Sequence, residues 1–171
     1  HKRALTGRNV DAPLSLYVHI PFCESLCYYC ACNRVVTHDW RRGSQYVDYL
    51  AKEVSLQSPH LGDRRRVAQL HLGGGTPTFL TSVDLERLMM MLRGAFVLSP
   101  EGEYSLAIDP RTVSARRIGF LRHLGFNRMS IGVQDFDADV QRAVHRVQPA
   151  RLVCDAIAAA LSAYNYIIKK L

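Results

Sequence analysis

Residues 14–32 read LSLYVHIPFCESLCYYCAC, an alternating apolar and polar run followed by four cysteines within ten positions. The whole chain of 171 residues has only five cysteines, so four of them are gathered at one place. The alternation over Leu14–Ile20 predicts a β-strand with one apolar face. The cysteines therefore follow directly after a strand, where a loop can present several thiols to one site.

Strand and helix patterns alternate along the rest of the chain. Further strands are expected over 68–72, 104–109 and 127–134. Helices are expected over 44–54, 81–92, 114–124, 137–145 and 150–163. Ser44 is the predicted N-cap of the first helix, Thr81 and Asp84 resemble a capping box, and Gly125 closes the third helix. Such alternation is typical of parallel βαβ units.

The predicted strands have one apolar face and one polar or small face. In the first strand Leu16, Val18 and Ile20 share one face, while Tyr17 and His19 share the other. A doubly wound sheet is covered by helices on both faces and would be apolar on both. The pattern instead favours an α/β fold built as a partial (β/α) barrel, with parallel strands and the helices outside. Functional groups of such barrels lie at the carboxyl ends of the strands, where the cysteines are.

The length and composition predict one domain. At roughly 30 residues per βα unit, the chain holds four to five units, which we place at 14–171, preceded by an N-terminal arm at 1–13. The net charge is +7, but the densest basic cluster, Arg64–Arg66, has no interleaved aromatic residues, so we expect no nucleic-acid partner. No apolar run approaches the length of a membrane span, and no secretory signal follows His1. We therefore expect no membrane association.

Three kinds of site could use four thiols this close together. Disulfides between such near neighbours have poor geometry. Structural zinc usually takes two well-separated pairs of ligands, whereas Cys30 and Cys32 are separated by a single residue. The third interpretation is an iron–sulfur cluster held by the C-x3-C-x2-C set Cys23, Cys27 and Cys30. Three thiolates on a four-iron cluster leave one iron open to a ligand from outside the protein. A metal site of this kind, in turn, predicts reduced thiols and a cytoplasmic location.

The spacing C-x3-C-x2-C after the first strand of a barrel resembles the signature of radical S-adenosylmethionine (SAM) enzymes, with Tyr29 as the aromatic residue before the third cysteine. Within that superfamily, three stretches resemble oxygen-independent coproporphyrinogen III oxidase (dehydrogenase): YVHIPFC at 17–23, GGGTPT at 73–78 and SIGVQDF at 130–136. Cys32 and the run Asp109-Pro110-Arg111 favour the oxidase over a related haem-chaperone branch. The resemblance extends from about Pro13 to Arg146 and implies a partial barrel of the radical SAM type.

The resemblance also implies which residues contact the two cofactors, a [4Fe–4S] cluster and SAM. The cluster would be held by Cys23, Cys27 and Cys30. Residues expected to contact SAM are Tyr17, Tyr29, Gly74, Gly75, Thr76, Gln134 and Arg146. The glycine-rich stretch follows a strand, where missing Cβ atoms let the backbone approach a ligand. Arg146 is expected to face the SAM carboxylate, for which a bidentate guanidinium is suited. Cys154 lies on the last helix among alanines and is expected to be a buried thiol.

The implied reaction is the oxidative decarboxylation of two propionate side chains of coproporphyrinogen III, which gives protoporphyrinogen IX. The resemblance implies that a 5′-deoxyadenosyl radical removes a hydrogen from the β-carbon of each propionate. Loss of carbon dioxide and one electron then leaves a vinyl group. The partners implied are the tetracarboxylate substrate and a flavodoxin-type electron donor, and we expect a monomer.

Two features depart from the family pattern. The family has an acidic residue two positions before the Asp-Pro pair, where this chain has Ala107. The chain also ends after four to five units, and 164–171 does not match the family's next strand. We therefore interpret the sequence as an N-terminal portion or a truncated relative. These departures motivate the alternative that it is a non-catalytic, cluster- or haem-binding relative like the chaperone branch.

Overall fold

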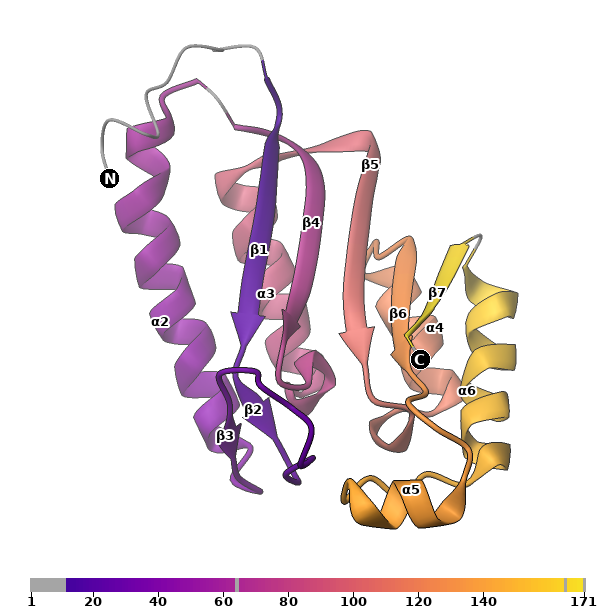
Figure 1. The fold of residues 1–171 in the computed structure, drawn as a ribbon. Helices are drawn as coiled ribbons and strands as arrows, with labels where there is room; N and C mark the ends of the chain where they lie inside the picture. The colour runs from indigo at the N-terminus through magenta and orange to yellow at the C-terminus, as the bar shows by residue number, and fades with distance from the viewer. Residues whose placement is uncertain (1–11, 64, 165, 171) are drawn as a thin grey trace.

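In the computed structural model, described over residues 12–63, 65–164 and 166–170, five parallel strands form one sheet in the order β1-β4-β5-β6-β7. These strands are β1 (Leu14–Ile20), β4 (Arg66–Gly74), β5 (Val97–Ile108), β6 (Arg128–Gly132) and β7 (Tyr166–Lys170). Two short strands, β2 (Phe22–Cys23) and β3 (Val35–Val36), pair beside it. Figure 1 shows that β2 and β3 lie at the end of the sheet to which the arrowheads of β1, β4, β5 and β6 point.

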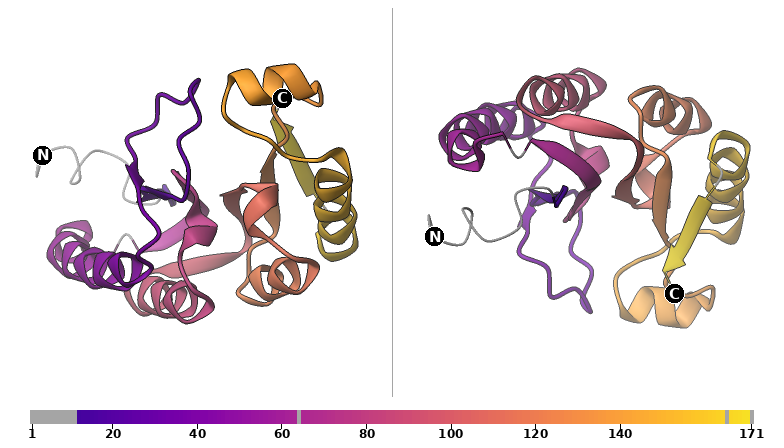
Figure 2. Two further views of the ribbon diagram at one scale, coloured as in Figure 1. Left: turned by 90° about the horizontal axis from the view of Figure 1, so that it is seen from below. Right: turned by 90° about the horizontal axis from the view of Figure 1, so that it is seen from above.

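The helices connect successive strands. They are α2 (Arg41–Gln57), α3 (Ser82–Ala95), α4 (Ala115–His123), α5 (Ala138–Ala143) and α6 (Ala150–Ala163). All except α5 lie on one side of the sheet (Figure 2). Figure 2, seen along the strands, shows a curved sheet with α2, α3, α4 and α6 around its outside, while α5 lies across one end. Three 3-10 turns, 58–61, 77–79 and 110–112, complete the connections. The predicted α/β fold with parallel strands and outer helices is confirmed.

The core lies between the sheet and the outer helices. Alternate strand residues such as Leu70, Leu72 and Leu106 are fully buried there. The opposite face is polar: the Ser15 hydroxyl donates to Gln69 Oε1 at 3.2 Å. The predicted division of each strand into an apolar and a polar face is thus confirmed, because the period-two alternation sends successive side chains to opposite faces.

Several element boundaries differ from the sequence prediction. Helix α2 begins at Arg41 with Trp40 as N-cap, so the prediction of Ser44 as N-cap was wrong. Ser44 lies one turn inside the helix, where its hydroxyl donates to Asp84 Oδ2 at 2.9 Å and ties α2 to α3. Strand β5 begins at Val97 and not at residue 104, because its first residues pair with the start of β4 before a bulge. The segment 97–103 contains Pro and Gly, which concealed the strand.

The predicted helix ends at Thr81 and Gly125 are confirmed. The Thr81 hydroxyl accepts from the Asp84 backbone N–H at 3.1 Å, and Gly125 has a φ of +97°. Cys154, in contrast, is exposed, so the prediction of a buried thiol was wrong. The physical reason is its position: α6 turns Val153, Ala156 and Ala160 toward the core, and a residue adjacent to Val153 points about 100° away.

At the chain ends, residues 166–170 form β7, parallel to β6, which the sequence did not predict. Most of the predicted arm at 1–13 lies outside the described residues, so that assignment stays a prediction. Across the described part of the chain, no helix combines the length and apolar character needed to cross a membrane.

A core substitution tests the packing. We expect Phe126→Ala to lower the free energy of unfolding by about 3–5 kcal/mol, because Phe126 is fully buried beside α4 and its loss leaves a cavity. Urea denaturation of the variant and of wild type measures the difference. Phe136→Ala is the matched control: Phe136 is 55% exposed, so its removal should change stability by no more than about 0.5 kcal/mol. Equal losses for both variants would contradict the packing described here.

Candidate metal and cofactor site

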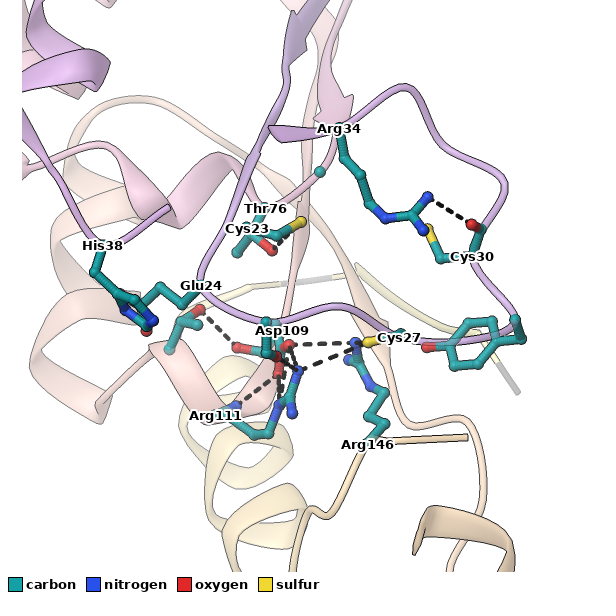
Figure 3. Close-up of a pocket in the computed structure, with 14 residues that line it drawn as sticks. Cys23, Glu24, Cys27, Cys30, Arg34, His38, Thr76, Asp109, Arg111 and Arg146 are labelled. Atoms are coloured by element: carbon teal, nitrogen blue, oxygen red, sulfur yellow. Dashed lines mark hydrogen bonds and ion pairs between the residues drawn. The ribbon is translucent and has the colours of Figure 1, made fainter. Parts of the chain in front are cut away.

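A cavity of about 300 Å³ opens at the carboxyl end of the strands, and we call it the cysteine cavity. Figure 3 shows its lining side chains. It is lined by Cys23 of β2, by the loop between β2 and β3, and by His38 after β3. The segments that follow β4 and β5, and the segment between α5 and α6, complete the lining. The lining residues are Cys23, Glu24, Ser25, Cys27, Tyr29, Cys30, Arg34, His38, Gly75, Thr76, Asp109, Arg111, Thr112 and Arg146.

The first thiol is presented by a strand. Cys23 ends β2, and its carbonyl accepts from the Thr37 N–H at 2.9 Å, which holds β2 against β3. The Thr76 hydroxyl lies 3.6 Å from Cys23 Sγ and donates to it. Burial raises the pKa of the Cys23 thiol, and the Thr76 hydrogen bond opposes that rise because it favours the thiolate.

The second and third thiols are presented by the loop. Cys27 is 7% exposed, and Cys30 is half-buried. The loop turns between them with a hydrogen bond from the Cys30 N–H to the Cys27 carbonyl at 3.1 Å. Arg34 Nη1 donates to the carbonyls of Cys30 at 2.6 Å and Cys32 at 3.0 Å, which holds the loop's second half. Among the described residues, Arg34 Nε is one of the buried side-chain atoms with no hydrogen-bond partner.

Two further arginines lie against Cys27 and share one carboxylate. Arg146 Nη1 is 3.6 Å and Arg111 Nη2 is 3.9 Å from Cys27 Sγ. Both also pair with Asp109 Oδ2, Arg111 at 2.7 Å and Arg146 at 3.2 Å. Asp109 is 6% and Arg146 is 8% exposed, so this is a mostly desolvated network. The positive charge of Arg34, Arg111 and Arg146 suits a site that gathers thiolates or an anionic ligand.

The glycines after β4 leave room that a side chain would fill. A Cβ on Gly75 would lie 2.6 Å from the Phe22 carbonyl oxygen and 2.9 Å from Cys23 Sγ. Gly74 has a φ of +106°, a conformation that favours glycine. Backbone and sulfur therefore approach each other closely at the wall of the cavity. The predicted approach of this backbone to a ligand stays a prediction.

The residues present fit an iron–sulfur cluster. Three thiols line one cavity, arginines surround them, and Gly75 leaves space next to Cys23. Cysteine thiolates are the usual ligands of such clusters, and their negative charge is balanced by these arginines. Within the ranges that the structure describes, no three His, Cys, Asp or Glu side chains form a group that could hold a single metal ion.

Comparison with known families gives the assignment. Residues 17–168 match the Radical SAM superfamily, which is most of the chain. The chain belongs to the radical SAM superfamily. This membership agrees with the C-x3-C-x2-C spacing and with the position of the thiols at the carboxyl end of a parallel sheet.

Among radical SAM proteins, the chain is similar to oxygen-independent coproporphyrinogen III oxidases. It is 52% identical over 144 residues to the one from Pseudomonas aeruginosa, covering 83% of this chain and 31% of the relative. It is 47% identical over 147 residues to the one from Escherichia coli, covering 86% of this chain and 32% of the relative. The chain thus spans about a third of the length of the curated relatives it matches.

A solved radical SAM structure has the same fold. Coproporphyrinogen III oxidase (HemN) from Escherichia coli, described in its title as a radical SAM enzyme, superposes with a TM-score of 0.90 at 41% identity. The match covers 97% of this chain and 39% of that chain. The partial barrel described here is therefore a radical SAM fold.

The structure brings most of the predicted site residues together. Seven of them line the cysteine cavity: Cys23, Cys27, Cys30, Tyr29, Gly75, Thr76 and Arg146. Tyr29 is 45% exposed, and partial burial raises its pKa to about 12, so it is a neutral phenol at physiological pH. Arg146 already uses its guanidinium for Asp109, Cys27 and the Gly132 carbonyl, the last at 3.0 Å. A SAM carboxylate would have to compete with Asp109 for it.

Three predicted residues do not line the cavity. Gly74 adjoins it through Gly75. Tyr17 lies on the polar face of β1, where its ring stacks on His71 with centroids 5.9 Å apart and its hydroxyl is 3.2 Å from His19 Nδ1. Gln134 follows β6 with a φ of 64°, and a Cβ on Gly132 would lie 3.0 Å from both Gln134 Nε2 and Arg146 Nη2. Gln134 is therefore next to Arg146, and its role toward SAM stays a prediction.

Asp109 and Arg111 were not predicted as site residues, although the run that contains them favours the oxidase family. The signal was present, because Asp109 directly follows β5 and the carboxyl ends of parallel strands meet at one edge. Ala107, where the resemblance predicts an acidic residue, is half-buried and pairs in register with Ser130 of β6.

The shared carboxylate gives a testable prediction. We expect Asp109→Asn to lower the free energy of unfolding by about 3–5 kcal/mol, because it leaves two partly buried arginines without their anion. Urea denaturation of the apoprotein measures this. In the matched control, Asp48→Asn, an exposed carboxylate that pairs with Arg87 is lost, and no measurable change is expected. If Asp109→Asn changed the free energy of unfolding no more than Asp48→Asn does, the Asp109 network would not stabilise the fold.

Proposed function

We propose that this chain provides the cluster- and SAM-binding part of an oxygen-independent coproporphyrinogen III dehydrogenase of haem biosynthesis. The observation that carries the proposal is the cysteine cavity, where Cys23, Cys27 and Cys30 line one space with three arginines at the carboxyl end of the sheet. The similarity to coproporphyrinogen III oxidases over most of this chain supports the choice of substrate.

The cysteines and Arg34 have direct roles in this proposal. Thiolates of Cys23, Cys27 and Cys30 would hold a [4Fe–4S] cluster and leave one iron open for SAM. Arg34, whose Nε has no partner among the described residues, offers a donor to an anionic group in the cavity. When bound, the cluster would supply one electron for the reductive cleavage of SAM, and SAM would supply the carbon radical able to abstract hydrogen from a substrate propionate.

The surrounding residues prepare the site for these groups. Gly75 keeps the wall open beside Cys23, and Thr76 orients that thiol through its hydroxyl. Asp109 fixes the directions of Arg111 and Arg146, so that their positive charge stays next to Cys27. A preorganised arrangement of this kind does not have to reorient when a charged ligand enters.

The remaining assignments belong to the same proposal. The substrate would be coproporphyrinogen III, and the product protoporphyrinogen IX. A flavodoxin-type protein would donate the electron, the protein would act as a monomer in the cytoplasm, and neither nucleic acid nor membrane would be a partner. The domain would extend over 14–171 with an arm at 1–13.

Electron paramagnetic resonance tests the proposal. The protein is reconstituted with iron and sulfide without oxygen, reduced with dithionite, and measured with and without SAM. We expect a reduced four-iron signal that changes when SAM is added, because one iron is open to it. A signal indifferent to SAM, together with stable haem binding, would favour the chaperone-like alternative. Zinc without iron would contradict the cluster assignment.

Ala107 gives a prediction about SAM affinity. We expect Ala107→Glu to bind SAM about tenfold more tightly, because a carboxylate on the polar face near the cavity can accept a charge-assisted hydrogen bond from the SAM ammonium group. Titration of the reduced cluster signal with SAM measures the affinity. Ala107→Gln, of equal size but neutral, is the control and should gain far less. Equal affinities for the two variants would argue against a charge effect.

A further inference from the structure

The loop that carries Cys27 is attached to the segment between α5 and α6 by its backbone and by one ring pair. The Tyr28 N–H donates to the Val144 carbonyl at 3.0 Å. His145 Nδ1 lies 2.6 Å from the Leu26 carbonyl oxygen, and since a carbonyl only accepts, Nδ1 carries the proton. The rings of Tyr28 and His145 stack with centroids 5.1 Å apart at an angle of 13°. Three contacts thus join residues that are 116 to 119 positions apart in sequence.

These contacts are made on the surface of the molecule. Tyr28 is 65% exposed, and His145 is also exposed, so core burial does not explain their pairing. His145 has a φ of 55°, a backbone conformation that residues other than glycine rarely adopt. This conformation belongs to the end of α5, where the His145 N–H donates to the Arg142 carbonyl at 3.1 Å and the Arg146 N–H to the Gln141 carbonyl at 2.8 Å. The His145 side chain then adds the contacts to the Leu26 carbonyl and the Tyr28 ring.

The residue after His145 contacts the thiol before Tyr28. Arg146 Nη1 donates to Cys27 Sγ at 3.6 Å, and the same atom pairs with Asp109 Oδ2 at 3.2 Å. The stacked pair therefore connects the two chain segments directly beside the contact between Arg146 and the buried thiol. A shift of either segment would move the guanidinium away from the sulfur.

We propose that Tyr28 and His145 form a clamp that positions Cys27 and Arg146 relative to each other. Both are positioning residues, because neither lines the cysteine cavity. The clamp itself is a property of the apoprotein. Its consequence for SAM, which is the correct placement of Arg146 next to the middle cluster ligand, rests on the proposed function.

The first test uses the apoprotein. In His145→Ala and in Tyr28→Ala, we expect hydrogen exchange at the residue 28 amide and alkylation of Cys27 to be about tenfold faster than in wild type. Loss of a stacked pair or of a hydrogen bond commonly has an effect of about this size. Tyr28→Phe keeps the ring and should stay within about twofold of wild type, a rescue that a general loss of stability would not show.

Matched controls remove similar side chains elsewhere. Tyr49 on α2 is 57% exposed, and His123 ends α4 at the surface. Tyr49→Ala and His123→Ala should leave both rates at residues 27 and 28 unchanged. The double variant Tyr28→Ala/His145→Ala should be no faster than His145→Ala alone, since that substitution already removes the stacked pair.

The second test uses the reconstituted protein. We expect both alanine variants to bind as much iron as wild type but to need about tenfold more SAM for the same change in the reduced cluster signal. If the wild-type signal ignores SAM, the proposed function fails, and the exchange and alkylation rates of the apoprotein still decide the clamp. Wild-type rates of amide exchange and Cys27 alkylation in Tyr28→Ala would overturn the clamp. This outcome decides even if His145→Ala fails to fold, because removing the exposed Tyr28 side chain leaves no cavity.

Discussion

Serine at position 23, 27 or 30 is expected to reduce cluster assembly to below about a tenth of the wild-type level. Each of these three cysteines lines the same cavity, and a serine hydroxyl is a far poorer ligand for iron than a thiolate. The variants Cys23→Ser, Cys27→Ser and Cys30→Ser are reconstituted with iron and sulfide without oxygen. Iron and sulfide per chain, with the visible absorbance of the cluster, measure the outcome.

The two remaining cysteines serve as controls. Cys32 is exposed and does not line the cavity, and Cys154 is exposed on α6. Cys32→Ser and Cys154→Ser should therefore hold the wild-type amount of iron and sulfide. If Cys32→Ser lost the cluster while one of the other three variants retained it, the assignment of the three ligands would be wrong. If all five variants bound equal iron, the metal would lie elsewhere.

Gly75→Ala is expected to weaken SAM binding by at least about tenfold and to lower the yield of cluster. The added Cβ would lie 2.6 Å from the Phe22 carbonyl oxygen and 2.9 Å from Cys23 Sγ, distances that normal contacts do not reach. The backbone cannot simply move aside, since the Gly75 N–H donates to Ile20 at 2.8 Å and the Thr76 N–H to Phe22 at 2.7 Å. The strain therefore displaces Cys23, the first thiol.

A second glycine provides the control for this substitution. A Cβ on Gly119, within α4, would meet nothing within 4 Å. Gly119→Ala should leave iron content and SAM binding unchanged and raise the free energy of unfolding by about 0.5–1 kcal/mol, because glycine is unfavourable inside helices. The reduced cluster signal, titrated with SAM in both variants, makes the comparison. Wild-type behaviour of Gly75→Ala would show that the cavity wall tolerates a side chain.

Much of the fold follows from local patterns that the sequence displays. The alternation in Leu14–Ile20 determines which residues face the helices, since side chains of a strand alternate whatever surrounds it. Thr81 begins α3 and Gly125 terminates α4, each through contacts within a few residues. Where the interaction partner is distant, prediction failed. Ser44 resembles a cap but binds Asp84 on another helix, and Cys154 is exposed because of how α6 is rotated against the sheet.

The three thiols could be recognised as a set of candidate cluster ligands from the sequence alone, because their spacing of three and two residues is a local property of one loop. The sequence also determined the glycine-rich wall and, through the resemblance, Arg146. The surroundings of those thiols depend on tertiary contacts. Arg111 and Arg146 share the carboxylate of Asp109, and the ring of Tyr28 stacks on that of His145. Asp109 and Arg146 are 37 positions apart, and Tyr28 and His145 are 117 apart, so these contacts exist only once the parallel strands bring their carboxyl ends to one edge.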